Sequence, residues 1–411
     1  MKFTRFIAAI TVTLACSSAA YAVETLVFWS SGYPQQVQQV LQSKVFPAFE
    51  ERYGVKIEYK DIGWGGPRDE QLVTGFAGGV GPDVYVNGTE LWAVELDEFV
   101  GKWDEASAIH PAFWEISRWM SRGRLLYVPQ TLEVRGYAYN KRLFMEAGLG
   151  VNPPAGWDEM LEYVRKLTKL DEAGSRVTQS GFETTWNAPF VANEYDWFIQ
   201  QAGSSLHTID LTTSLINTPT GVEALDYMLE LYNIAHPPGY QPVATNQFAR
   251  GAIAITRGLV SAKQQMEQAA PEEVQFFGLF APRRDADSRP VALTLVNGLS
   301  ISRSAKDPDL AWKFIQYMMS AEVQRDFAEV GQMMVAHNEV AADTSLDIVA
   351  WLQPWYEISP YAAPVGQFGT RRPQVANILV SALAGRISPG EAIIRMAEEH
   401  QLGLDEVFGA Q

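Results

Sequence analysis

The sequence predicts an α/β fold divided into two lobes. At 411 residues the chain exceeds the size of one typical domain. The stretches 24–31 and 55–59 are typical of strands and flank a helix with apolar residues at three- and four-residue spacing that Gly54 is predicted to end, which is a βαβ unit. A third stretch, 125–145, predicts two short strands with a bend between them and then a helix after Asn140. A strand that leaves one sheet and enters another is expected to act as a hinge.

The N-terminal 22 residues have the three regions of a secretory signal peptide. Lys2 and Arg5 precede an apolar run over 6–15, and Ala20-Tyr21-Ala22 fits a cleavage site between small residues. We therefore expect export to the periplasm with cleavage after Ala22. A buried N-terminal helix is the structural alternative. Lipidation of Cys16 is a further one, disfavoured because no leucine stands three residues before it.

Composition excludes several classes of function. Hydrophobic residues make up 47% and charged residues 19%, which suits a globular protein with a sizeable core. The formal net charge of −16 disfavours nucleic acid and anionic lipid as partners. Without Cys16 the mature chain has no cysteine for a disulfide, a metal site or a nucleophile. No later apolar run reaches the roughly 18 residues of a membrane span.

The strand over 24–31 ends in candidate ligand-binding residues. In an open α/β sheet, ligands gather beyond the carboxyl ends of strands, and Trp29, Ser30 and Ser31 stand at that end. The loop 63–67 adds Trp64, and its glycines lack the Lys-Ser/Thr of a phosphate-binding loop. Further along, 91–99 predicts a short helix, and the loop after Phe182 contains Trp186 and Asn187.

Four stretches resemble the extracellular solute-binding proteins that feed sugars to ABC importers, in the maltose and multiple-sugar class. They are Gly81-Pro82-Asp83, 139–157, 251–258 and 311–324. The resemblance implies a periplasmic-binding-protein fold of type II, with a ligand cleft between two lobes. It implies an N-terminal lobe of 23–130 plus 298–345 and a C-terminal lobe of 131–297 plus 346–411. One departure is Gly331-Gln332-Met333-Met334, where the family writes Gly-x-x-Pro.

The same resemblance implies further ligand contacts. Asp83 is favoured as a turn-former over a ligand, while Glu133 is weighed evenly between a hinge carboxylate and a solvated strand residue. Arg257 follows a strand that faces the cleft, although Leu259 and Val260 replace the aromatic expected after it. The remaining candidates, taken from their positions in the family pattern, are Asn87, Glu90, Gly258, Asn297 and Arg371.

The chemistry of these residues favours a carbohydrate. A sugar needs aromatic faces together with forked donors and carboxylate or amide acceptors, and of 12 tryptophans Trp29, Trp64 and Trp186 are the best placed. Trp197, on a helix, is expected in the core. Arg257 and Arg371 leave open a sugar acid or glycerol phosphate held by arginine.

We therefore predict the substrate-binding component of an ABC transporter. It would capture a sugar-like solute by hinge closure, without cofactor or metal, and deliver it as a monomer to an inner-membrane permease. The five histidines show no metal spacing and Gly-x-Ser-x-Gly is absent, so no enzymatic activity is predicted. A secreted carbohydrate-active enzyme is the rival, since chance carboxylate pairs exist. A cell-envelope adhesin is a weaker third reading.

Overall fold

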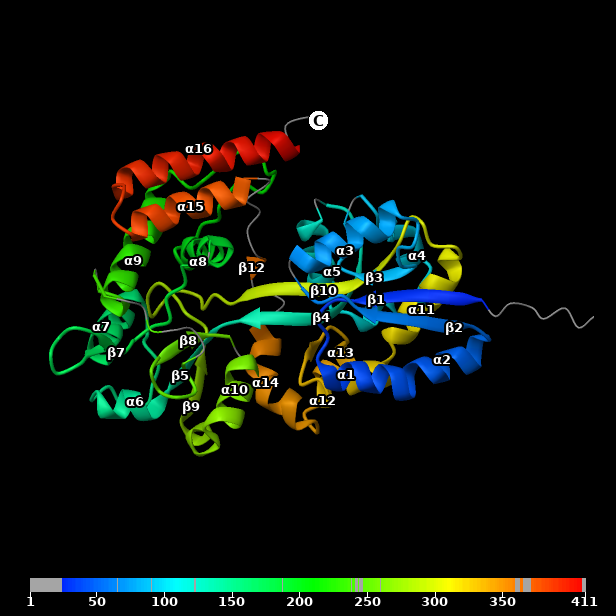
Figure 1. Cartoon of the computed structure of the whole chain (residues 1–411), viewed down its shortest axis with the longest axis horizontal. Coiled ribbons are helices and arrows are strands. Elements are labelled where there is room, and N and C mark those ends of the chain that lie inside the picture. Colours follow the sequence, from blue (N-terminus) through cyan, green and yellow to red (C-terminus); the bar gives the residue numbers. More distant parts are fainter. Residues whose placement is uncertain are drawn as a thin grey trace, which may run out of the picture.

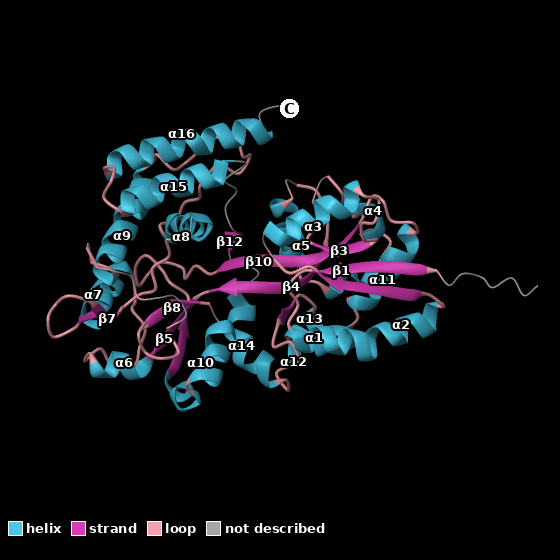
Figure 2. Cartoon of the chain, viewed as in Figure 1, coloured by secondary structure: helices cyan, strands magenta, loops and turns pink. Residues whose placement is uncertain are grey.

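The computed structural model describes residues 24–408 except 65, 90, 122, 187, 238, 241, 242, 244–246, 259, 359–362 and 365–370. These residues form an α/β structure of two lobes joined by extended strands (Figures 1 and 2). The larger lobe contains a seven-stranded sheet, and the other contains sheets of three and two strands. The predicted signal peptide, with Cys16 and the cleavage after Ala22, lies outside the described residues.

The seven-stranded sheet has the order β11-β4-β10-β3-β1-β2, with β12 paired to β10. Strand β1 is parallel to β2 and β3, whereas β10 is antiparallel to β3 and β4. The parallel pair confirms the βαβ unit expected near the N-terminus. The strands of this sheet are β1 (Thr25–Ser30), β2 (Lys56–Asp61), β3 (Val84–Val86), β4 (Val128–Arg135), β10 (Leu293–Ile301), β11 (Met334–Val335) and β12 (Ala363–Pro364).

The helix of that βαβ unit ends where the sequence predicts. It runs through α1 (Gln35–Val40), a π-helical turn η1 (Leu41–Val45) and α2 (Phe46–Tyr53). Gly54 closes it in the left-handed conformation with φ of 69°, and its amide donates to the carbonyl of Glu50. Phe46 and Phe49 are buried against the apolar face of β1, so the helix packs on the sheet rather than standing apart.

Helices cover both faces of the large sheet. In Figure 1, α3 and α5 lie above it while α1, α2 and α12 lie below. The expected helix over 91–99 is wrong in extent, because only the four residues of α4 are helical there. The other helices packed around this sheet are α3 (Gly66–Ala77), α4 (Asp97–Val100), η2 (Asp104–Ala108), α5 (Pro111–Met120), α11 (Pro308–Met318), α12 (Ala321–Glu329), α13 (Asn338–Ala341) and α14 (Asp347–Ile358).

Two antiparallel strands carry the chain toward the second lobe. β4 pairs with β10 from Leu299↔Val128 to Leu293↔Arg135, and Figure 1 shows them side by side. β4 then continues through Gly136 into β5 (Tyr137–Asn140) of the three-stranded sheet. A Cβ on Gly136 would lie 2.1 Å from the Trp355 ring, so only glycine lets the backbone pass there.

The second lobe has its own core. Its three-stranded sheet has the order β8-β5-β9, and helices α7, α8, α9, α15 and α16 surround a separate set of buried apolar side chains. The elements of this lobe are α6 (Lys141–Glu146), α7 (Trp157–Leu167), β6 (Lys169–Leu170), β7 (Val177–Gln179), α8 (Ala188–Gln201), α9 (Pro219–Ala235), β8 (Ile255–Arg257), α10 (Val260–Ala269), η3 (Pro271–Phe276), β9 (Phe277–Phe280), α15 (Arg372–Leu383) and α16 (Pro389–Phe408).

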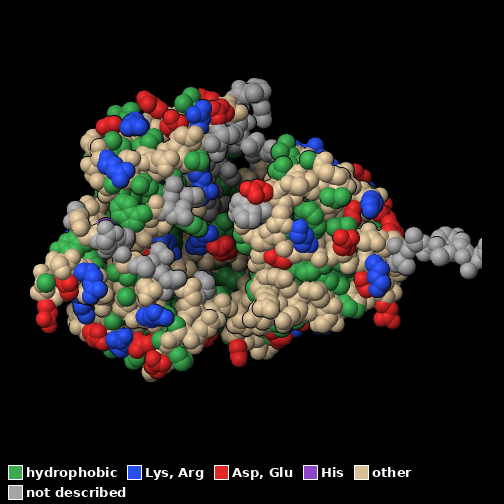
Figure 3. All heavy atoms as spheres, in the orientation of Figure 1, with side chains coloured by type: hydrophobic (Ala, Val, Ile, Leu, Met, Phe, Trp, Pro, Cys, Tyr) green, Lys and Arg blue, Asp and Glu red, His purple; other side chains and the backbone are tan. Residues whose placement is uncertain are grey.

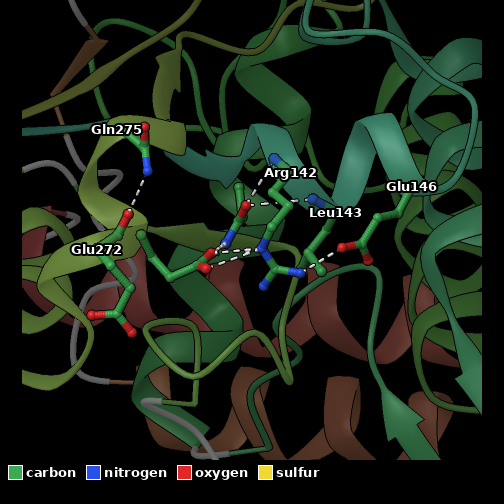
Figure 4. A network of polar contacts seen from close by, with 7 residues as sticks. Arg142, Leu143, Glu146, Glu272 and Gln275 are labelled. Carbon is green, nitrogen blue, oxygen red and sulfur yellow. Dashed lines mark hydrogen bonds and ion pairs between the residues drawn. The ribbon is translucent and has the colours of Figure 1, made fainter.

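The helix predicted after Asn140 is present as α6. The Asn140 side chain caps it by accepting from the amide of Arg142 at 2.9 Å. Arg142 also binds Glu146 at 2.6 Å along the helix and Glu273 of η3 at 2.9 Å, in the network around Arg142 drawn in Figure 4. Asn140 and Arg142 thus tie the start of α6 to η3.

Within the described residues, no helix has both the length and the apolar character needed to cross a membrane.

Candidate functional site

A cavity of about 710 Å³ opens between the two lobes. Figure 3 shows a hollow between them in which acidic and basic side chains are both visible. Segments at the ends of β1 and β11 and the strand β4 supply one wall, while α8 and β8 supply the other. Its lining includes Ser31, Gly32, Tyr33, Trp64, Glu133, Arg135, Glu183, Asn193, Glu194, Trp197, Arg257, Gly258, Asn297, Gln332 and Met333.

The three candidates at the end of β1 have different surroundings. Ser31 lines the cavity. The hydroxyl of Ser30 is used inside the lobe, since it donates to Asp61 Oδ2 at 2.5 Å. Trp29 is 8% exposed and does not line the cavity, and its ring lies 5.0 Å from the ammonium of Lys60. Ser31 is therefore the member of this group that borders the cavity, but it is 1% exposed and its hydroxyl accepts from Arg68 Nε at 3.1 Å.

Trp64 is an exposed aromatic at the cavity wall. It keeps 49% of its surface exposed and lines the cavity. Its ring lies over Gly32, where an added Cβ would come within 2.1 Å of Trp64 Cδ1. Gly32 has φ of 64°, so both its conformation and the ring above it require glycine. Gly32 and the Arg68 guanidinium, 6.0 Å from the ring centroid, hold the indole at the cavity wall while about half of its surface stays exposed.

Asp83 and Asn87 act behind the wall. Asp83 accepts from the amide of Val27 at 2.8 Å and from that of Lys306 at 3.0 Å, which fits a turn-former. Asn87 donates to Asn297 Oδ1 at 2.8 Å and so orients a side chain that does line the cavity. Glu90, with which these two were grouped, lies outside the described residues.

Glu133 and Arg135 form an ion pair at the hinge strand. Both line the cavity, and Arg135 Nη2 lies 2.8 Å from Glu133 Oε1. Arg135 was not among the candidates from sequence. Its position two residues after Glu133 places it on the same face of β4, and this periodicity was a usable signal.

The wall from the second lobe carries a compact ionic cluster. Arg257, at the end of β8, donates through Nη1 to Glu194 Oε2 at 2.5 Å. Its Nη2 lies 3.5 Å from Glu183 Oε2, which also accepts from Thr256 Oγ1 at 2.5 Å. The Tyr232 hydroxyl donates to the same Glu194 Oε2. The cluster thus joins β8, α8, α9 and the loop before α8.

Burial dominates the electrostatics of this cluster. It raises the pKa of the Glu194 carboxyl, although Arg257 and Tyr232 act in the opposite direction. Burial also raises the pKa of Tyr232 far above its usual range, with Glu194 adding to the effect, so this hydroxyl stays a donor. Burial alone would lower the pKa of Arg257, but the charge of Glu194 reverses this and the guanidinium stays charged.

Two other candidates are not at this cavity. Trp186 packs edge-on against Tyr232 and does not line the wall. Arg371 binds Glu406 and lies 3.5 Å from Glu399, both on α16. Asn187 lies outside the described residues. Gly258, which follows Arg257, does line the cavity.

Several lining residues escaped the sequence analysis. Gln332 and Met333 belong to the stretch noted as a departure from the family pattern, and Gln332 has φ of 52°. Glu194 and Trp197 lie on α8, and Trp197, although 2% exposed and in the core as expected, still borders the cavity. A helix that both packs in the core and faces a cleft gives no distinct sequence pattern.

No group of three or more His, Cys, Asp and Glu side chains among the described residues is arranged to hold a metal ion. A second cavity, of about 530 Å³, lies beside the C-terminal end of α8. There Trp119 of the first lobe stacks on His207 of the second at 5.8 Å. It is separate from the cavity that holds the candidate residues.

Comparison with known families identifies the class of protein. The model of the bacterial extracellular solute-binding proteins matches residues 32–325, which is most of the chain. The chain belongs to this family. Binding proteins of Brucella abortus and Brucella suis are 22% identical over 318 residues, covering 72% of this chain and 73% of theirs. The resemblance inferred from sequence is therefore confirmed.

Solved structures confirm the two-lobed fold of this solute-binding protein. An ABC transporter solute-binding protein of Thermotoga lettingae, bound to α-D-tagatose, aligns with a TM-score of 0.75 at 24% identity, covering 93% of this chain and all of that one. The cyclic α-maltosyl-1,6-maltose binding protein of Arthrobacter globiformis aligns with a TM-score of 0.73 at 19% identity, covering 94% of this chain and all of that one. A solute-binding protein of Agrobacterium radiobacter in complex with ribitol aligns with a TM-score of 0.70 at 22% identity, covering 92% of this chain and 98% of that one.

Proposed function

We propose that this protein captures a neutral polyhydroxylated solute, a sugar or a sugar alcohol, in the cavity between its lobes. The observation that carries the proposal is the lining itself: an exposed indole at Trp64 faces a wall of carboxylate, guanidinium, amide and hydroxyl groups. A sugar presents apolar C–H faces ringed by hydroxyls, and such a lining matches both. The related structures bind tagatose, a cyclic maltosyl-maltose and ribitol, which share this chemistry.

The charges of the cavity favour a neutral ligand over an acidic one. Its lining contains three glutamates and two arginines, and each arginine already faces a glutamate. A sugar acid or a glycerol phosphate would have to compete with these carboxylates for the guanidinium groups. Arg371, the other arginine considered for such a ligand, pairs with α16 away from the cavity.

In this proposal the solute bridges the lobes and shifts the hinge at β4 and β10 toward closure. The closed protein then delivers the solute to an ABC transporter permease in the inner membrane. Residues 1–22 act as a signal peptide that is removed after Ala22, and the mature protein works in the periplasm as a monomer without catalysis. We assign 23–135 with 293–358 to the lobe of the seven-stranded sheet and 136–292 with 372–411 to the other. These boundaries replace the 130, 298 and 345 expected from sequence, because β4, β10 and α14 pack in the first lobe.

The test is a ligand panel on the purified mature protein. It contains monosaccharides, oligosaccharides, sugar alcohols, sugar acids and glycerol phosphates, screened by thermal unfolding and then by titration calorimetry. A ligand at 100 times its Kd should add about 2.7 kcal/mol to the free energy of unfolding. Each positive mixture is also checked by chromatography, because product formation would support the carbohydrate-active enzyme instead. Stabilisation by the acidic ligands alone would refute the neutral-ligand assignment.

A further inference from the structure

The carboxyl of Glu194 has one oxygen fully used and one without a partner. Its Oε2 accepts from both Arg257 and Tyr232, as described above. Its Oε1 is buried and has no hydrogen-bond partner among the described residues. The side chain is 1% exposed and lines the cavity between the lobes. A buried carboxylate oxygen left unpaired costs free energy, and the place of this one at the cavity wall indicates that a ligand pairs with it.

We propose that Glu194 determines ligand specificity by pairing its Oε1 with one particular hydroxyl of the bound solute. This inference rests on the proposed function and names the group that reads the solute on the wall of the second lobe. Since Arg257 and Tyr232 hold Oε2, Oε1 is the oxygen of this cavity-lining carboxyl that remains for a ligand.

The surroundings of Glu194 select a hydroxyl over other groups. A hydroxyl both donates and accepts, so it pairs with Oε1 whether the carboxyl is ionised or protonated. An ammonium only donates and so pairs best with the ionised form, whereas a carboxylate or phosphate only accepts and needs the protonated form. Arg257 of β8 and Tyr232 of α9 hold Oε2 by hydrogen bonds, while Glu183, in the loop before α8, acts on this carboxyl as a like charge.

A second buried hydroxyl is the competing explanation. Burial, and after it the charge of Glu194, raises the pKa of Tyr137 on β5, whose hydroxyl is buried behind the cavity wall without a partner among the described residues. If Tyr137 instead bound the solute, it and not Glu194 would recognise the solute hydroxyl that determines specificity. The experiment therefore includes Tyr137→Phe, which removes that hydroxyl while keeping the ring.

The experiment measures discrimination between ligands by titration calorimetry. The probes are maltose, D-tagatose and ribitol, followed by monodeoxy analogues of each one that binds. In the wild type, one deoxy analogue should bind about 10- to 100-fold more weakly, as expected for loss of a hydrogen bond to a charged group. Glu194→Leu should bind the parent ligand more weakly by the same factor, and its affinity for that deoxy analogue should equal that of the wild type.

Two variants keep the experiment interpretable if Glu194→Leu does not fold. Glu194→Gln keeps the size of the side chain and an acceptor for Arg257, but its amide nitrogen only donates. Its affinity for the parent ligand should stay within a few-fold of the wild-type value, and it should not bind a monoamino analogue that carries an ammonium in place of that hydroxyl. Glu273→Gln is the matched control, since Glu273 also pairs with an arginine, Arg142, but does not line the cavity. It should leave every affinity unchanged.

The outcomes separate this inference from the function on which it rests. Failure of the wild type to bind any neutral probe refutes the proposed function and this inference together. Binding with uniform loss across all analogues in Glu194→Leu refutes the inference alone, because Glu194 would then act only by supporting Arg257. Loss of discrimination in Tyr137→Phe, with Glu194→Leu unaffected, would transfer the role to Tyr137 and overturn the assignment.

Discussion

Trp64 and Trp29 were equal candidates as stacking platforms, and the structure gives them different expected effects. Trp64 is 49% exposed at the cavity wall. A tryptophan buries about 200 Å² in full, so a ligand that covers the exposed half removes roughly 100 Å² from water. At about 25 cal/mol per Å² this contributes about 2.5 kcal/mol, and Trp64→Ala should raise Kd about 60-fold. Its unfolding free energy should change little.

Trp29→Ala should show the opposite behaviour. Trp29 is 8% exposed and packs against Gly75, where an added Cβ would lie 2.6 Å from its ring. Truncation leaves a cavity in the core and should lower the free energy of unfolding by about 3–5 kcal/mol. Calorimetric titration with the best panel ligand and urea unfolding, run on both variants, give the two quantities. Unchanged affinity in Trp64→Ala, or lost affinity at unchanged stability in Trp29→Ala, would refute the reasoning.

Three further predictions follow from single residues. Burial raises the pKa of Glu194, so its contribution to stability is present below the ordinary carboxyl pKa and is lost as pH rises through the raised value. In urea unfolding between about pH 4 and about pH 8, the free energy of unfolding of the wild type should therefore fall relative to that of Glu194→Gln. Parallel curves for the two proteins would contradict this. Gly298→Ala places a Cβ 2.1 Å from the Val128 carbonyl oxygen and should cost about 3 kcal/mol of unfolding free energy, whereas Gly390→Ala, with open space around it, should cost nothing. Arg371→Ala should keep ligand affinity within twofold by calorimetry, and a tenfold loss would place this arginine in the site.

Local patterns in the sequence predicted several elements correctly. Gly54 ends the first helix because a left-handed residue is needed there, and Asn140 starts α6 because its side chain can accept from the first free amides. The extent of the helix at 91–99 was not predictable in this way. Ala93 and Leu96 are buried there, and the amide of Val94 donates to the Ile301 carbonyl of a distant strand instead of to a helical turn.

The sequence by itself determined the family, the α/β class and the residues Ser31, Trp64, Glu133, Arg257, Gly258 and Asn297 at the cavity. These residues either stand at strand ends or belong to motifs with a fixed order, so neighbours along the chain identify them. Only the tertiary structure decided that Trp29, Trp186 and Arg371 face elsewhere and that Glu194 faces the cavity. Which side of a strand or helix meets the cleft depends on how the two lobes pack, and that packing is set by contacts between residues far apart in sequence.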